Sequence, residues 1–182
     1  MKILFCDNSL REFLNFRSDI VKSYIDRGDE VVIVAPNNSE IPSYLDKIKY
    51  YPIKLSRGGM NPLSDIKLML NYLKIYHRES PDYIFHYTIK PNIYGTFAAK
   101  MAGIPSIIMV AGLGYVFTAN GLGCKIARKL YKAALSMSKK VLVLNQSNYQ
   151  YLLDTGLSNS AKLILLKGGE GINLTEFDNK PI

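Results

Sequence analysis

Hydrophobic residues along the chain form two alternating patterns, short continuous runs and longer stretches with helical spacing. The short runs are rich in Val, Ile, Leu and Phe, which is typical of strands buried on both faces of a parallel sheet. They predict strands at residues 2–7, 30–35, 50–55, 81–86, 105–110, 140–144 and 162–166. The stretches between them predict a first helix that ends at Gly28, a weak helix at 43–49, and helices at 62–78, 92–102, 122–137 and 146–154.

Apolar residues at helical intervals indicate which face of a predicted helix packs on the sheet. In the first helix these residues are Phe13, Phe16, Ile20 and Tyr24, seconded by Val21 and Ile25. In the second long helix, which begins with Pro62, they are Leu63, Ile66, Leu70 and Leu73. In the helix at 122–137 they are Ile126, Leu130, Ala134 and Met137.

Strands that alternate with helices predict an α/β fold, because each right-handed crossover between parallel strands places its helix on one face of the sheet. We therefore predict a single Rossmann-like, doubly wound parallel sheet. The sequence shows no internal repeat and no low-complexity segment. We expect one domain at residues 1–177, and residues 178–182 to begin a linker to a further domain.

The composition is that of an ordinary globular chain. Of the 182 residues, 48% are hydrophobic and 21% are charged, which excludes a disordered or collagen-like protein.

Cys6 and Cys124 are the only cysteines and show no metal-ligand spacing, so we predict no metal site and reduced thiols in the cytoplasm. Residues 101–124 carry no charge, but Pro105 and five glycines favour a buried strand and a glycine loop over a membrane span.

The charge distribution is uneven. The formal net charge is +8, and no carboxylate occurs between Asp82 and Asp154. We predict from this a cationic, carboxylate-free surface that attracts phosphates, anionic lipid headgroups or nucleic acid; a solvated basic face is the alternative. Nucleic acid is the least favoured partner, because no recognised reading motif accompanies the basic residues.

Ligands of open α/β sheets bind beyond the carboxyl ends of the strands, so the residues after each strand are the candidate site. A dinucleotide cofactor would require G-x-G-x-x-G after the first strand, where Asp7, Asn8 and Ser9 stand instead, and no Walker A motif occurs. We therefore predict no bound NAD, FAD or other cofactor. Gly112 and Gly114, which flank Leu113 and precede Tyr115, can either bring main-chain amides close to a ligand or form a tight turn.

Three further side chains follow strands or loops of this edge. His86 could bond a sugar hydroxyl or assist proton transfer, but a structural role is equally compatible with its position. Lys90, shortly before Asn92, is either an anion contact or a solvated lysine. Arg57, beside two glycines, is either a phosphate clamp or an exposed loop residue.

The helix at 122–137 is basic and amphipathic. Its cations are Lys125, Arg128, Lys129 and Lys132. They either form a solvated outer face or rest on an anionic bilayer.

Three segments resemble the amino-terminal domain of bacterial family 4 glycosyltransferases. They are Tyr-Thr-Ile-Lys-Pro-Asn-Ile-Tyr-Gly at 87–95, Ala-Gly-Leu-Gly-Tyr-Val-Phe at 111–117 and Gly-Ile-Asn-Leu-Thr-Glu-Phe at 171–177. Within that family the chain is most similar to enzymes that extend capsule, O-antigen or N-glycan precursors on a polyprenyl diphosphate. The resemblance follows the whole chain in order, and Asn61-Pro62-Leu63 adds to it.

The resemblance implies a GT-B enzyme, in which two Rossmann-like domains face each other. The acceptor is bound mainly by the first domain and the sugar nucleotide mainly by the second. It implies metal-independent transfer with retention of anomeric configuration, at the cytoplasmic face of the plasma membrane. The positions that match are His86, Lys90, Asn92 and the loop 112–115, which we expect to be acceptor-side or cleft residues.

Two departures from the family pattern affect the expected contacts. The glycine pair that many relatives carry after the first strand is absent, and Ala111 stands where some relatives have an acidic residue. Two other functions remain open from the sequence: a membrane-recruiting subunit of a split glycosyltransferase, and one half of a sugar-nucleotide 2-epimerase with the same fold.

Overall fold

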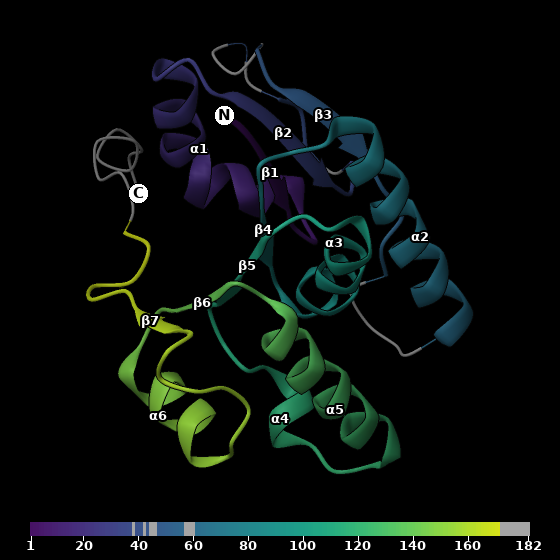
Figure 1. The fold of residues 1–182 in the computed structure, drawn as a ribbon, viewed down its shortest axis with the longest axis vertical. Coiled ribbons are helices and arrows are strands. Elements are labelled where there is room, and N and C mark those ends of the chain that lie inside the picture. The colour runs from purple at the N-terminus through teal and green to yellow at the C-terminus, as the bar shows by residue number, and fades with distance from the viewer. Residues whose placement is uncertain (38, 42, 44–46, 57–60, 172–182) are drawn as a thin grey trace, which may run out of the picture.

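The computed structural model describes residues 1–37, 39–41, 43, 47–56 and 61–171 (Figure 1). Within them, seven parallel strands form one sheet in the order β3-β2-β1-β4-β5-β6-β7. The strands are β1 (Lys2–Cys6), β2 (Glu30–Ala35), β3 (Lys49–Pro52), β4 (Tyr83–Tyr87), β5 (Ser106–Val110), β6 (Lys140–Val143) and β7 (Leu163–Leu165). The predicted doubly wound α/β sheet is confirmed. The predicted linker at 178–182 lies outside the described residues.

Six α-helices accompany the sheet in the described residues. They are α1 (Leu10–Asp26), α2 (Pro62–Glu79), α3 (Thr96–Ala102), α4 (Tyr115–Thr118), α5 (Leu122–Met137) and α6 (Gln146–Asp154). The side chains of Ser9, Asn61 and Asn145 accept hydrogen bonds from the first free amides of α1, α2 and α6.

Two parts of the helix prediction differ from the structure. The helix expected at 92–102 is divided into a π-helix, η2 (Pro91–Gly95), and the α-helix α3. The short helix α4 was not predicted. Of the weak helix expected at 43–49, residues 44–46 lie outside the described residues, and Lys49 instead begins β3.

Alternate strand residues supply two cores, one on each face of the sheet. Ile3 and Phe5 pack with α1, whereas Leu4 and Cys6 pack with α2. Figure 1 shows α1 on one side of the sheet and α2, α3 and α5 side by side on the other. Because α2, α3 and α5 are neighbours on one face, we call them together the helix layer.

The predicted buried stripe of α2 is wrong at three of its four positions, and only Leu73 packs partly against the core. Leu63, Ile66 and Leu70 are 80%, 51% and 50% exposed. The buried face instead consists of Asp65, Leu68, Tyr72, Tyr76 and Glu79. Helical spacing cannot choose between two apolar stripes, and the tyrosine stripe buries more area than the aliphatic one.

The same correction applies to parts of two other helices. Ile126 and Met137 of α5 are exposed, and its buried residues are Cys124, Ala127, Tyr131, Ala134 and Leu135. Ala134 was predicted correctly. In α1, Phe13 and Val21 are buried as predicted, but Phe16 is 49% exposed.

The charge-free stretch 101–124 folds as the end of α3, then β5, α4 and the start of α5. Among the described helices, none combines the length and the apolar character needed to cross a bilayer.

A pair of leucines in α2 tests which stripe holds the core. Leu68→Ala should lower the free energy of unfolding by about 2–5 kcal/mol, because it leaves a cavity beneath the helix. Leu70→Ala should change it by at most about 0.5 kcal/mol, because this side chain is half-exposed. Urea unfolding of both variants measures the difference, and similar losses for both would contradict the packing described.

Candidate functional site

The loop after β1 is closed by a buried ion cluster. Arg17 of α1 lies with its guanidinium 3.3 Å from the Asp7 carboxylate and donates two hydrogen bonds to Glu170, at 3.0 and 2.9 Å. The guanidinium also lies 3.9 Å from the centre of the Tyr87 ring. Arg17 thus joins the ends of β1 and β4 to the segment that follows β7. Asn8, a predicted site residue, lies half-buried in this loop.

Asp7 is almost fully buried, and its burial raises the pKa of its carboxyl to about 6, against the opposing effect of Arg17. The cluster contains one cation and two carboxylates. The described part of this loop therefore offers no unneutralised positive charge to a phosphate.

Lys90 is also paired. Its ammonium group lies 2.7 Å from the Asp65 carboxylate of α2, and the Tyr94 hydroxyl donates to the other Asp65 oxygen at 2.9 Å. Both charged side chains are largely shielded from solvent, at 13% and 7% exposure. A bound anion would have to share Lys90 with Asp65.

These two clusters correct the prediction of a carboxylate-free edge. The sequence window without carboxylates is real, but Asp7, Asp65 and Glu170 come from outside it and lie against residues of the edge. At these two clusters the cations of the edge are neutralised by carboxylates.

His86 is fully buried below the edge. Its Nε2 lies 2.8 Å from the Tyr76 hydroxyl, and its Nδ1 lies 3.2 Å from Thr96 Oγ1. Burial lowers the pKa of the ring to about 3, so His86 is neutral. A Cβ on Gly95 would lie 2.5 Å from two atoms of the ring, which explains the glycine in this π-helix. The geometry favours the structural alternative for His86 over direct contact with a substrate.

Asn92 is likewise buried. Its amide nitrogen donates to the Met109 carbonyl and the Tyr131 hydroxyl, at 3.0 and 3.2 Å, while its Oδ1 has no partner among the described residues. These bonds tie η2 to β5 and α5. Asn92 therefore has a structural role at the carboxyl edge of the sheet. A direct contact of Asn92 with the sugar acceptor stays a prediction.

The glycine loop that follows β5 is open. Gly112 and Gly114 are exposed, and Gly114 has a φ of +62°, the left-handed region that favours glycine. Leu113 is half-buried against the core of the helix layer. The exposure of both glycines is compatible with either predicted role, and a contact with a ligand stays a prediction. Tyr115 begins α4, and the Arg57 prediction lies outside the described residues.

Thr88 is a candidate that the sequence analysis did not single out. It directly follows β4 and has a φ of +68°, a conformation that is costly for a β-branched residue. Its hydroxyl oxygen is enclosed and has no partner among the described residues. Backbone strain together with an unsatisfied polar group is a feature of binding sites. The strain at Thr88 is visible only in its backbone angles, so the sequence could not indicate it.

The four cations predicted on α5 divide into two groups. Lys125, Lys129 and Lys132 are exposed. The Arg128 guanidinium is already engaged within the protein, because it donates hydrogen bonds to the carbonyls of Val116 and Ala119. These bonds hold α4 against α5.

The family model described as glycosyl transferase 4-like matches residues 2–146. The chain belongs to this family. The resemblance found in the sequence is thereby confirmed, and the edge described above belongs to a glycosyl transferase 4-like domain.

A curated relative and two solved structures match the chain over about half of their own length. The relative is N,N'-diacetylbacillosaminyl-diphospho-undecaprenol alpha-1,3-N-acetylgalactosaminyltransferase of Campylobacter jejuni, 29% identical over 97% of the chain and 48% of that protein. A glycosyltransferase from Rickettsia africae matches 99% of the chain and 46% of its own, with 17% identity and a TM-score of 0.65. The UDP-GlcNAc 2-epimerase of Methanocaldococcus jannaschii matches 91% and 45%, with 17% identity and a TM-score of 0.64.

The chain spans about half the length of the curated relatives it matches. Because a transferase and an epimerase superimpose about equally well, the structural likeness shows the fold alone.

The burial of His86 predicts an acid-sensitive stability. Its pKa is about 6.5 when unfolded and about 3 when folded, so the unfolded state binds more protons between these values and stability falls as pH falls. From about pH 7.5 to about pH 5, the wild type should lose about 2 kcal/mol relative to His86→Gln.

Urea unfolding of both proteins at the two pH values measures this difference. Asp7→Asn is the control of opposite sign, because the raised pKa of Asp7 stabilises the folded state at low pH. Equal pH dependence of the wild type and His86→Gln would contradict the burial of a neutral ring.

Proposed function

We propose that this chain is the acceptor-binding half of a glycosyltransferase that moves a sugar from a sugar nucleotide to a polyprenyl-diphosphate-linked glycan. The observation that carries the proposal is the family match over residues 2–146, together with a relative whose name specifies a diphospho-undecaprenol acceptor. A carboxyl-terminal GT-B domain would bind most of the donor. The 182-residue chain alone should therefore turn over little or nothing.

The proposed transfer retains the anomeric configuration and requires no metal or cofactor. The leaving nucleotide diphosphate develops negative charge, which preorganised amides and cations can stabilise in place of a metal ion. The exposed backbone of Gly112 and Gly114 supports such a contact in this chain, and the strained Thr88, whose enclosed hydroxyl has no partner among the described residues, is a second candidate. Lys90 would contribute charge only as part of its pair with Asp65.

Peripheral attachment to the cytoplasmic face of the plasma membrane is supported by the helix layer. Of the eleven large hydrophobic side chains exposed among the described residues, seven lie there: Leu63, Ile66, Leu70, Met101, Leu122, Ile126 and Met137. Its exposed cations are Lys67, Lys74, Arg78, Lys100, Lys125, Lys129 and Lys132. Its two carboxylates, Asp65 and Glu79, are buried in ion pairs. An apolar surface with charge of one sign matches an anionic bilayer.

The transfer reaction is tested on the full-length polypeptide with a panel of sugar nucleotides and a polyprenyl-diphosphate sugar. The double variant Asp65→Asn/Lys90→Gln removes the charged pair without leaving a buried charge alone. It should lower kcat/KM for the acceptor by about 5- to 150-fold, or about 1–3 kcal/mol, and leave the KM of the sugar nucleotide unchanged.

Lys22→Gln/Asp26→Asn is the matched control, since it removes an exposed pair on α1. Unchanged acceptor kinetics in the Lys90 double variant would remove its role. The proposed function would be contradicted if none of the sugar nucleotides in the panel supported transfer to the acceptor. It would also be contradicted by turnover of a sugar nucleotide in the absence of acceptor, a result that would indicate an epimerase.

Membrane attachment has its own test. Lys125→Gln/Lys129→Gln/Lys132→Gln should weaken binding to vesicles of phosphatidylcholine and phosphatidylglycerol at least tenfold in a sedimentation assay, since each lysine near an anionic surface contributes about 1 kcal/mol. The control Lys22→Gln/Lys47→Gln/Lys167→Gln changes the net charge equally. Equal weakening by both triple variants would show that net charge, and not this surface, is responsible.

A further inference from the structure

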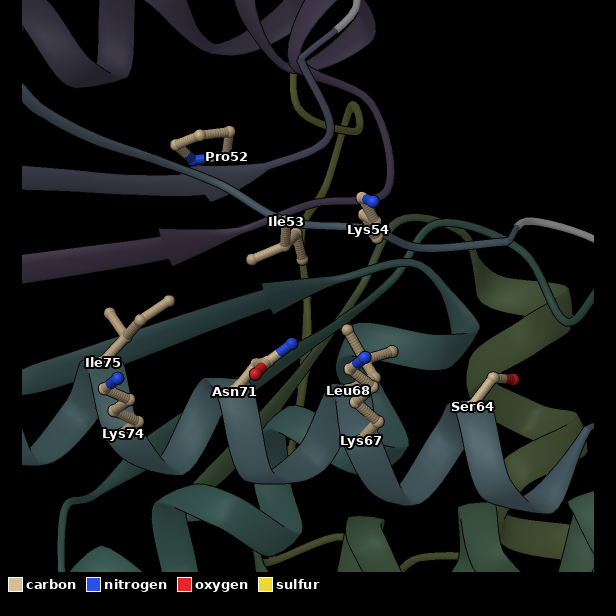
Figure 2. A pocket seen from close by; sticks show the side chains of 9 residues that line it. All are labelled: Pro52, Ile53, Lys54, Ser64, Lys67, Leu68, Asn71, Lys74 and Ile75. Carbon is tan, nitrogen blue, oxygen red and sulfur yellow. The ribbon is translucent and has the colours of Figure 1, made fainter.

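A groove of about 380 Å³ runs between the segment after β3 and one flank of α2. Figure 2 shows Lys54 above the groove, with Lys67, Asn71 and Lys74 along the helix below it. Lys54, Lys67 and Ser64 lie toward the arrowheads of the strands, so the groove opens at the carboxyl edge of the sheet. The volume is within the range of about 300–1,000 Å³ that is usual for small-molecule sites.

The floor of the groove is apolar and fixed. Ile53 and Leu68 are 8% and 3% exposed, and both belong to the core beneath the helix layer. The backbone amide of Ile53 donates to the Ala35 carbonyl at 3.2 Å, which holds this segment beside β2. Ile75 extends the apolar surface away from the edge.

The rim of the groove carries unbalanced positive charge. Lys67, Asn71 and Lys74 follow one another at helical spacing and share one flank of α2, opposite Lys54. None of the three ammonium groups forms an ion pair or hydrogen bond within the described residues. Three like charges around one groove repel each other, and an anion between them would relieve the repulsion.

The carboxylates of α2 do not balance these lysines, because each is bound elsewhere. Asp65 faces η2, where it pairs with Lys90. Glu79, at the far end of the helix, contacts Lys2 and Lys49 and accepts from the Tyr51 hydroxyl at 2.5 Å. The groove therefore differs from the neutralised pairs of the candidate site.

We propose that this groove binds the diphosphate and the first isoprene units of the lipid-linked acceptor. The lysine rim would hold the diphosphate, and the apolar floor would hold the adjoining hydrocarbon. An amphiphile uses both surfaces, whereas an inorganic anion would use the lysines alone. The naming of this ligand rests on the proposed function, because a phospholipid presents the same combination of phosphate and hydrocarbon.

Binding is measured by calorimetric titration of the chain with farnesyl diphosphate, a water-soluble diphosphate with a short isoprenoid tail. The wild type should bind it at least tenfold more tightly than either inorganic diphosphate or farnesol. Lys54→Gln/Lys67→Gln/Lys74→Gln should weaken its binding at least tenfold. The control Lys22→Gln/Lys47→Gln/Lys167→Gln, with the same loss of charge, should change it less than twofold.

Two results on the chain would overturn the site. One is equal weakening by both triple variants, and the other is the absence of saturable binding. Thermal unfolding of each variant confirms that it is folded, which is expected because the three lysines are exposed. Ile75→Ala should weaken farnesyl diphosphate and leave inorganic diphosphate unchanged, and equal effects on both would contradict the apolar part of the site.

Two further measurements separate this inference from the proposed function. Short-chain phosphatidylglycerol should bind at least tenfold more weakly than farnesyl diphosphate, and equal affinity would overturn the lipid-diphosphate assignment in favour of a phospholipid site. In the full-length enzyme the groove variant should raise the acceptor KM and not the sugar-nucleotide KM. Unchanged acceptor kinetics with active transfer would overturn the groove alone, whereas lysine-dependent binding without any transfer would contradict the proposed function alone.

Discussion

The pairing of β1 with β2 on one side and β4 on the other sets where the loops that carry Asp7 and Thr88 leave the sheet. The connections after β1 and β4 lead away in opposite directions, so the two loops diverge at the carboxyl edge, and the Arg17 side chain lies between the ends of these strands. Asp7 and Thr88 stand directly beyond these two strands. The strained backbone of Thr88 and the buried cluster of Arg17 both lie at this point of divergence.

Below the edge, a chain of buried polar side chains replaces ordinary apolar packing. Cys6 contacts the Tyr76 hydroxyl at 3.1 Å, Tyr76 contacts His86, and His86 contacts Thr96. Buried polar groups are costly unless they are hydrogen-bonded, and satisfied groups fix one arrangement. This chain links β1, α2, β4 and α3, and so makes a rigid base for the loops above it.

The cations near the sheet edge and those on the helix layer differ in their burial and in their partners. Near the sheet edge, cations are paired with carboxylates that come from distant parts of the sequence. On the helix layer and in the groove beside β3, lysines have apolar neighbours and no carboxylate partner among the described residues. The second environment suits a lipid whose headgroup is anionic and whose tail is hydrocarbon.

The sequence by itself determined the strands, their parallel arrangement and the family, because β-branched runs and local motifs carry that information within a few residues. The start of α2 followed from Pro62, and most other helix bounds followed from the extent of the apolar periodicity. Only the tertiary structure decided which stripe of α2 is buried, that Lys90 pairs with Asp65, and that His86 is enclosed by Tyr76 and Gly95. Each of these depends on side chains from separate elements competing for the same space and the same charge partner, and sequence spacing records neither distance nor burial between elements.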